Sequence, residues 1–251
     1  MRPQPVPHPE SRTTPRTGIG AALWILAAAQ FLAVQLIAGA AWRSPYSWVR
    51  NNISDLGNVH CRNWDVSRPR YVCSPLHDLM NASFVVHGVL LLAGALLTGA
   101  WWGRGGISLT ARIVFAVNAA AWALVGLVPA DADENLHVLG ALIIMGVGNI
   151  GLLVAGFLPR GSRLGGLRPL TFVIAAIALT AALMFFGQYD PGIGMGTLER
   201  VAAFGADAWA VAAALAIFRG AARRSPAPRS SPLHFSHPGA ESRQEPRPFA
   251  R

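Results

Sequence analysis

Six long apolar segments constrain this chain more than any other feature of its sequence. They cover approximately residues 18–42, 76–102, 113–128, 136–158, 169–187 and 198–218. A helix needs about 20 apolar residues to cross the hydrocarbon core of a bilayer, so most segments are long enough alone and the third needs its flanking residues. We therefore predict an all-α fold: a polytopic membrane bundle of six transmembrane helices.

Composition supports a membrane protein and argues against a soluble one. Hydrophobic residues make up 53% of the chain and charged residues 13%, whereas soluble domains usually carry about 25% charged residues. The formal charge is +9, and every basic residue is an arginine. These arginines lie in tails and short loops beside the apolar segments. We therefore expect them to contact anionic lipid headgroups at the cytoplasmic face, and we expect no nucleic-acid partner.

The distribution of charge predicts the orientation of the chain. Arginines precede the first segment, occupy the second and fourth links, and follow the last segment. The third link instead holds Asp131, Asp133 and Glu134, and the fifth link holds Asp190 as its one charged residue. Because short cytoplasmic loops retain arginine, we predict that both termini are cytoplasmic in a multi-pass protein of the bacterial plasma membrane.

This orientation divides the chain into three regions. Residues 1–17 form a cytoplasmic N-terminal tail, residues 18–218 the transmembrane domain, and residues 219–251 a cytoplasmic tail rich in arginine and proline, with too few apolar residues to fold. The outer loop at 43–75 contains five arginines and breaks the charge pattern. An even number of spans nevertheless places it outside.

Both cysteines of the chain, Cys61 and Cys73, fall in this outer loop. An oxidising compartment allows them to pair, and their spacing is far wider than that of a usual zinc-binding cysteine pair. The ring would close about a dozen residues and stabilise the folded chain by about 3 kcal/mol. We therefore predict a disulfide between them.

The second apolar segment begins with a helix-start signal. Ser74 is the predicted N-cap and Pro75 the first helical residue, where a missing N–H costs nothing. His77 and Asn81 then lie one turn apart on one face. His87 lies about 15 Å deeper, so we expect it to be buried and to pack or donate a hydrogen bond.

Other polar residues interrupt the apolar segments at depth. Asp207 follows Arg200 by seven residues and lies about 10 Å deeper, so it should need a polar partner. Amides inside the segments should form hydrogen bonds between helices. They are Gln30, Gln35, Asn118 and Asn149.

A cluster of ionisable and amide residues lies near the predicted outer ends of the spans. Charged groups in a bilayer normally face the interior of a bundle or pair with one another, although residues at helix ends can also form a simple interfacial rim. We predict that they converge on one outward-facing polar pocket. The predicted pocket residues are Asp55, His77, Asn81, His137, Glu199 and Arg200.

Several short motifs in these regions resemble a known family. They lie at residues 46–47, 52–57 (NISDLG), 73–84 (CSPLHDLMNASF), 136–137 and 196–200 (GTLER). Together they resemble a prokaryotic membrane family catalogued as domain of unknown function nine hundred and ninety-eight. The resemblance covers about residues 18–218 and implies a six-helix membrane protein. The segment at 53–55 is also similar to the Frag1/DRAM/Sfk1 membrane proteins, some of which are tied to lipid remodelling.

Three functions are compatible with the predicted pocket. Binding of a lipid headgroup or small molecule is the first. The second is metal-dependent hydrolysis of outer-leaflet lipids, with Asp55, His77 and His137 as zinc ligands, Glu199 as general base and Arg200 holding a phosphate or carboxylate. Such an enzyme would resemble the ceramidase and adiponectin-receptor superfamily, but the last segment lacks that family's His-x-x-x-His pair. A transporter is the third alternative, although the chain shows no internal repeat.

Overall fold

The computed structural model describes residues 14–65 and 68–222 of the chain. It is a helical bundle, as predicted, and six of its helical segments are long enough and apolar enough to cross a membrane. These segments are Pro15–Ala40, His77–Leu97, Gly106–Leu127, Glu134–Ala155, Leu164–Phe186 and Gly205–Ala222. The predicted tails at 1–17 and 219–251 lie largely outside the described residues. The described parts of both tails are mostly helical, because α1 begins at Pro15 and α8 ends at Ala222.

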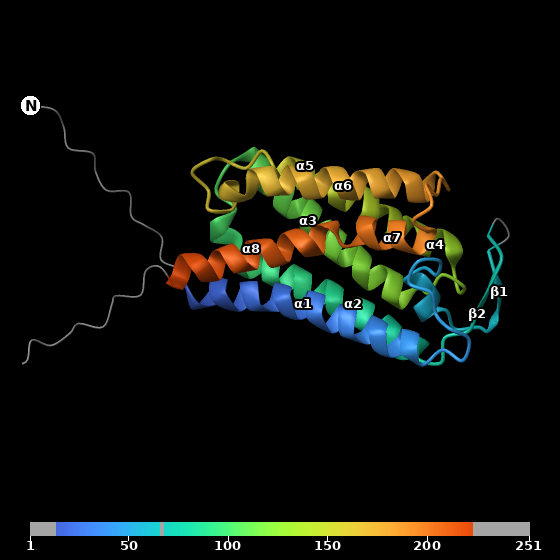
Figure 1. Cartoon of the computed structure of the whole chain (residues 1–251). Coiled ribbons are helices and arrows are strands. Elements are labelled where there is room, and N and C mark those ends of the chain that lie inside the picture. Colours follow the sequence, from blue (N-terminus) through green and yellow to red (C-terminus); the bar gives the residue numbers. More distant parts are fainter. Residues whose placement is uncertain (1–13, 66–67, 223–251) are drawn as a thin grey trace, which may run out of the picture.

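The helices and strands follow one another in a simple order. The α-helices are α1 (Pro15–Ala40), α2 (His77–Leu97), α3 (Gly106–Leu127), α4 (Glu134–Leu142), α5 (Gly148–Ala155), α6 (Arg168–Phe186), α7 (Met195–Ala203) and α8 (Gly205–Ala222). Short 3₁₀ helices are η1 (Ser54–Gly57), η2 (Gly99–Trp101) and η4 (Leu164–Leu167), and η3 (Ile143–Val147) is a π-helix. Strands β1 (Arg62–Trp64) and β2 (Arg70–Val72) form an antiparallel hairpin. Figure 1 shows that α1 begins and α8 ends at the same end of the bundle, opposite this hairpin.

Small residues bring the first three long helices close together. A side chain at Gly88 in α2 would collide with the Ala119 carbonyl of α3, and one at Gly94 would collide with Trp24 of α1. Close backbone approach of this kind is a main source of helix association in membranes, where apolar contact with lipid is equally favourable. Helix α1 also packs against α8, so the first and last spans are neighbours.

Aromatic side chains fill the centre of the bundle. Trp24, Trp102, Phe115 and Trp209 form one cluster, with the Trp24 and Trp209 ring centroids 6.1 Å apart. A second cluster surrounds Phe31, whose ring stacks on His87 at 4.5 Å. Aromatic contacts at these separations stabilise the fold by more than the burial of their apolar surface alone.

Two spans are interrupted, and one buried amide supports both interruptions. The fourth span contains the π-helix η3, and the last predicted segment, residues 198–218, is divided at Phe204 into α7 and α8, of which α8 is the part long enough to cross a membrane. The Asn149 Nδ2 atom donates to the Met145 carbonyl at 2.7 Å and to the Ala202 carbonyl at 2.8 Å. A side chain that captures a helix carbonyl in this way is a recognised cause of local distortion. The carbonyls released at the interruptions are thus satisfied from within the bundle.

The other buried amides also form hydrogen bonds, with one exception to our prediction. Asn118 donates to the Ile144 carbonyl of η3 at 3.1 Å, and Gln30 exchanges hydrogen bonds with Ser83 of α2. These bonds join different helices, as predicted. The prediction was wrong for Gln35, whose Nε2 donates to the Phe31 carbonyl of its own helix at 3.4 Å.

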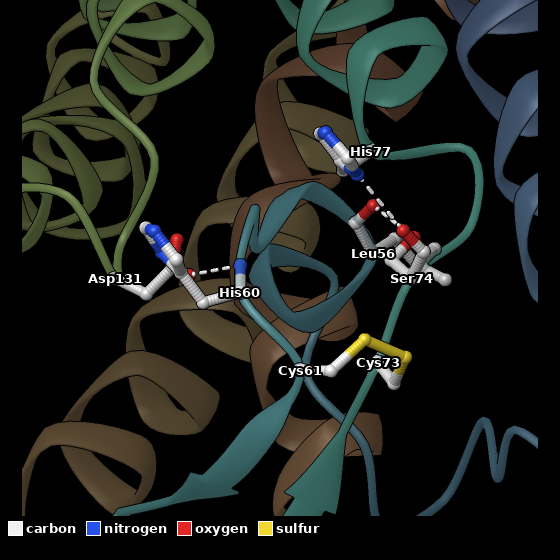
Figure 2. Close-up of a disulfide and its surroundings, with 7 residues drawn as sticks. All are labelled: Leu56, His60, Cys61, Cys73, Ser74, His77 and Asp131. Atoms are coloured by element: carbon white, nitrogen blue, oxygen red, sulfur yellow. Dashed lines mark hydrogen bonds and ion pairs between the residues drawn. A yellow bond between two sulfur atoms is a disulfide. The ribbon is translucent and has the colours of Figure 1, made fainter.

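The first link forms a structured loop over the predicted outer end of the bundle. Cys61 and Cys73 form the predicted disulfide at the base of the hairpin (Figure 2). The predicted start of the second span was wrong by two residues, because α2 begins at His77 and its N-cap position is Leu76. The Ser74 hydroxyl does not cap the helix. It donates instead to the Leu56 carbonyl at 2.7 Å and ties the loop to α2.

Candidate functional site

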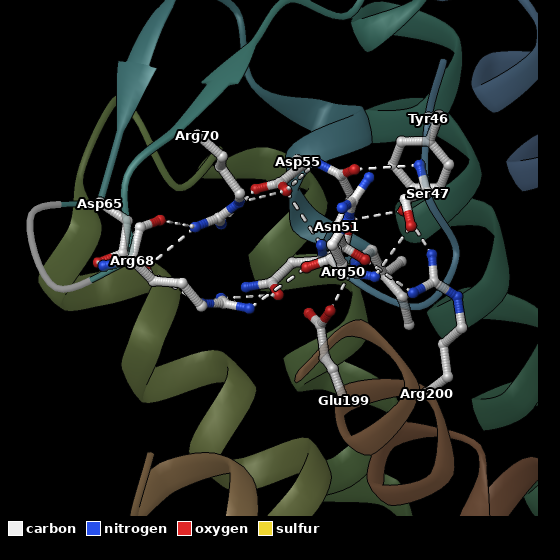
Figure 3. Close-up of polar contacts among 12 residues, drawn as sticks. Tyr46, Ser47, Arg50, Asn51, Asp55, Asp65, Arg68, Arg70, Glu199 and Arg200 are labelled. Carbon is white, nitrogen blue, oxygen red and sulfur yellow. Dashed lines mark hydrogen bonds and ion pairs between the residues drawn. The ribbon is translucent and has the colours of Figure 1, made fainter. Parts of the chain in front are cut away.

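Arg200 in α7 holds the first outer loop through its backbone. Its Nη1 atom donates to the carbonyls of Trp48 at 3.0 Å, Asn51 at 2.9 Å and Gly196 at 2.8 Å. Its Nη2 atom donates to the Tyr46 hydroxyl; Figure 3 shows Arg200 with Asn51 and Tyr46. The guanidinium also lies 4.6 Å from the Trp48 ring centroid and is buried. We call this set of contacts the Arg200 clamp.

Tyr46 extends the clamp into the loop. Its hydroxyl donates to the Asn52 carbonyl at 2.6 Å. Burial raises the pKa of Tyr46, so the phenol keeps its proton and remains a donor at physiological pH. The loop is therefore fixed where it meets α7.

Glu199, the neighbour of Arg200, binds the same loop two residues beyond Asn51. Its Oε2 atom accepts the Ile53 N–H at 2.5 Å, and its side chain is buried. Two consecutive residues of α7 thus contact a segment of the loop about 150 positions earlier in the chain. The motifs at 52–57 and 196–200 are the two sides of one contact.

Asp55 in η1 pairs with Arg70 in β2. The Arg70 Nε and Nη2 atoms donate to the two carboxylate oxygens of Asp55 at 2.8 and 2.7 Å. Burial alone would lower the pKa of Arg70, but the hydrogen bonds and Coulombic attraction to Asp55 and Asp65 together outweigh it and raise that pKa. The Arg70 Nη1 atom also donates to Asp65 at 3.0 Å. A paired, bidentate arrangement of this kind makes burial of both charges tolerable.

A pocket of about 370 Å³ lies under the outer loop, between α4, α6 and α7. We call it the outer pocket. Its polar lining comes from the loop, α4 and α7, and its apolar lining from α4 and α6. The residues that line it include Ser54, Arg68, Arg70, Glu134, His137, Val138, Ala141, Met145, Phe185, Phe186 and Glu199.

His137 has a fixed orientation at the outer pocket. Its Nδ1 atom lies 2.7 Å from the Val128 carbonyl oxygen. Because a carbonyl oxygen only accepts, Nδ1 carries a proton, and in the neutral ring Nε2 is then an acceptor. The pocket therefore offers an imidazole acceptor beside the Glu199 carboxylate.

A family model described as "Protein of unknown function (DUF998)" matches residues 25–216. This chain belongs to the DUF998 family. The match includes all the motifs that carried the resemblance and both sides of the Arg200 clamp. No curated protein and no solved structure matches the chain.

The structure of this DUF998 protein places the predicted pocket residues at several separate positions. His137 and Glu199 line the outer pocket. Asp55 lies behind Arg70, and Arg200 forms the clamp. His77 and Asn81 do not line it. His77 Nδ1 donates to the Ser74 carbonyl at 2.9 Å (Figure 2), and Asn81 Nδ2 donates to the Gly57 carbonyl at 2.9 Å.

The proposed zinc ligands do not form a ligand group in this DUF998 structure. Among residues 14–65 and 68–222, no three His, Cys, Asp or Glu side chains lie close enough to hold a metal ion. Asp55 is paired with Arg70, while one nitrogen of His77 and one of His137 are bound to carbonyl oxygens. The donor set does not fit a zinc centre in this conformation.

Two deeper polar residues are placed as the sequence predicts. His87 is fully buried, and its Nδ1 donates to the Ala27 carbonyl at 3.0 Å. Asp207 lies beside it, with Oδ1 3.0 Å from His87 Nε2. The polar partner predicted for Asp207 is therefore His87.

Arg68 and Arg70 were missed as residues of the outer pocket. The sequence contained one signal for them, because the outer loop carries five arginines where the charge rule expects few. The structure explains part of this excess. Arg70 pairs with Asp55 and Asp65, and Arg68 Nη2 donates to Asn52 Oδ1 at 3.1 Å.

Proposed function

We propose that this DUF998 protein binds a membrane lipid in the outer pocket, and that the headgroup carries both an anionic group and a hydrogen-bond donor. One observation carries the proposal: a single pocket has an ionic wall on the loop side and an apolar wall formed by membrane spans. Pockets of this size that combine apolar walls with a few convergent polar groups are the usual form of ligand sites.

The ionic wall supports a headgroup of mixed character. Arg68 and Arg70 supply positive charge, Asp65 and Glu134 supply negative charge, and Glu199 adds a buried carboxyl group. Arg68 Nε has no hydrogen-bond partner among the described residues and lies 3.7 Å from an Asp65 oxygen. A phosphate beside Arg68 and an ammonium or hydroxyl donor toward the carboxylates and His137 would match both signs of charge.

The apolar wall supports a lipid rather than a water-soluble ligand. Val138, Ala141 and Met145 belong to the fourth span, and Phe185 and Phe186 end the fifth. Val138 is 47% exposed and would contact acyl chains in a bilayer. An acyl chain along this wall would leave its headgroup under the outer loop.

Lipid binding is a better reading of the pocket than hydrolysis. The hydrolase alternative assigned three metal ligands, and two of these, Asp55 and His77, do not line the outer pocket. The residues that do line it provide acceptors and cations, which suffice for recognition. The proposal therefore concerns binding, without a chemical step.

Native mass spectrometry of the full-length protein tests the proposal with three lipids of equal chain length. Phosphatidylethanolamine has a phosphate and a donor, phosphatidylcholine has a phosphate without a donor, and diacylglycerol lacks the phosphate. We expect phosphatidylethanolamine to bind about tenfold more tightly than the other two, because a charge-assisted hydrogen bond contributes about 1.5 to 3 kcal/mol. Equal binding of the three lipids would contradict the proposal.

Matched variants locate the binding. Glu199→Gln and His137→Phe should each reduce the preference for phosphatidylethanolamine while the melting temperature shows that the protein is folded. Leu139→Ala is the control, because this residue lies on the same helix and is 49% exposed but does not line the pocket. An unchanged preference in both pocket variants would place the lipid elsewhere.

A further inference from the structure

A second cavity lies on the side of the bundle and shares no lining residue with the outer pocket. It is a groove of about 490 Å³ between α1 and α8, lined by Ala28, Phe31, Leu32, His87, Phe204, Asp207, Ala208 and Val211. His87 is the middle residue of the 21-residue helix α2, so the groove lies near mid-span. Leu32 is 46% exposed and Ala208 is also exposed, so the groove opens toward the surrounding lipid. We call it the mid-span groove.

The polar part of this groove is the His87–Asp207 pair. His87 Nδ1 carries a proton, because it donates to the Ala27 carbonyl at 3.0 Å. His87 Nε2 lies 3.0 Å from Asp207 Oδ1, and because two lone pairs would repel each other at this distance, we assign one more proton to these two atoms. Whether that proton belongs to the imidazole or to the carboxyl group, the pair is neutral as a whole.

Asp207 keeps unused capacity to accept hydrogen bonds. Neither of its oxygens forms a hydrogen bond of normal geometry among residues 14–65 and 68–222; Oδ1 lies 3.0 Å from His87 Nε2, and Oδ2 has no hydrogen-bond partner there. The Asp207 side chain is 6% exposed. A buried acceptor without a donor is unfavourable, and in hydrocarbon there is little water to replace the donor. The second oxygen of Asp207 therefore requires a donor that enters through the groove.

The shape and charge of the groove define that donor. Because the His87–Asp207 pair is neutral, a cation bound beside it would leave a net charge in the bilayer, which is costly. A neutral hydroxyl group supplies one O–H donor without adding charge. Phe31, Leu32 and Val211 provide an apolar surface along which a hydrocarbon chain can lie.

We propose that the mid-span groove binds a neutral lipid with a hydroxyl group, which donates to Asp207 Oδ2. The proposal is independent of the outer pocket, because the two sites share no lining residue. It assigns the His87–Asp207 pair to recognition of a molecule that resides inside the bilayer.

A pair of photoreactive probes tests this inference in the full-length protein in phosphatidylcholine nanodiscs. One probe is a long-chain alcohol with a diazirine and an alkyne, and the other is its methyl ether, which has the same length but no donor. The alcohol should label peptides of α1 and α8 about tenfold more than the ether, as expected for one hydrogen bond to a charged or strongly polar acceptor. Unlabelled alcohol should compete for this labelling.

Three variants make the outcome specific. Ala208→Phe should block the groove and reduce labelling by both probes without altering the polar pair. The double variant His87→Phe/Asp207→Leu removes both polar partners together, which is tolerated better than removing one, and should abolish the preference for the alcohol. Ala176→Phe adds the same ring at an exposed position of α6 and should change nothing.

Two results would overturn the inference. Equal labelling by the alcohol and the ether in the unmodified protein would mean that Asp207 is served by water or by no ligand. Labelling that persists in the Ala208→Phe variant would mean that the alcohol binds at another surface.

Discussion

Two neighbouring residues of α7, Glu199 and Arg200, have different roles although both are buried ionisable residues. Arg200 donates hydrogen bonds to the carbonyls of Trp48, Asn51 and Gly196 and to the Tyr46 hydroxyl. Glu199 accepts a loop N–H and also lines the outer pocket. The first residue is therefore part of the fold, and the second is available to a ligand as well.

Replacing Arg200 should destabilise the protein more than replacing any exposed arginine. Arg200→Ala leaves several buried carbonyls without a donor, and we expect the free energy of unfolding to fall by about 3 kcal/mol or more. Arg200→Lys should recover only part of the loss, because an ammonium lacks the planar fork. Thermal unfolding in detergent measures both, with exposed Arg50→Ala as the control. Equal melting temperatures for the two alanine variants would contradict the clamp.

Asp131 should make stability depend on pH. It accepts the Val59 N–H at 3.0 Å and the His60 N–H at 2.7 Å; burial alone would raise its pKa, but these bonds hold the pKa below the usual value of 3.8. A lowered pKa stabilises the folded state above pH 3.8, and the contribution is lost as the pH falls through the folded pKa. Asp131→Asn should therefore lower the melting temperature at pH 7 and have little effect near pH 2. The same deficit at both values would exclude this linkage.

At the scale of elements, the two interrupted spans and the disulfide-closed hairpin distinguish this bundle from six plain helices. The π-helix η3 and the division between α7 and α8 both depend on Asn149, which lies in a third element, α5. Gly205 lies against the Asn149 side chain and has no room for a Cβ atom. The distortion is therefore built by contacts between elements.

Removing the Asn149 amide should weaken both interruptions together. Asn149→Leu leaves the Met145 and Ala202 carbonyls without their side-chain donor, and we expect a loss of about 1 to 3 kcal/mol in the free energy of unfolding. Gln35→Leu is the matched control, since Gln35 is equally buried but bonds only within its own helix among the described residues. A comparable loss in the control would show that any buried amide has this effect.

The disulfide should matter more to the outer pocket than to the spans. The ring between Cys61 and Cys73 contains Arg68 and Arg70, which line the pocket. Cys61→Ser/Cys73→Ser should increase proteolysis at the hairpin and weaken lipid binding, while helix content by circular dichroism is preserved. The loop constraint contributes at most about 3 kcal/mol, which the six spans can lose without unfolding. A loss of helix content would instead show that the disulfide supports the bundle itself.

The interruptions also show where sequence-based prediction ends. The spans could be predicted because apolar length is a local property of the sequence. The division at Phe204 could not, because the asparagine that bonds beside it, Asn149, lies more than fifty positions away in the sequence. His137 and Glu199 were recognisable as polar groups in apolar segments. The role of Arg200 was not, because its partners are mostly backbone carbonyls, which leave no signature in the sequence.

At the scale of the whole molecule, the ends of the described chain lie together, and the loop with the hairpin lies at the other end (Figure 1). The arginine distribution predicts that the first of these ends is cytoplasmic. A reporter that is active only in the cytoplasm should be active when it is fused after residue 222. A reporter that is active only outside the cytoplasm should be active when it is inserted at residue 66. The reverse pattern would invert the outer pocket to the cytoplasmic side.

The Arg200 clamp has a consequence for biosynthesis. The loop from Tyr46 to Asp55 is made early, but the side chains that hold it, Glu199 and Arg200, are translated about 150 residues later. Until the final span enters the membrane, the carbonyls of this loop lack their guanidinium partner and α1 lacks its neighbour α8. The clamp joins α7, which is translated late, to a loop that is translated early, so the loop can be held in place only after α7 has been made. A nascent chain released before that point would leave this loop without its partners and exposed to cellular quality control.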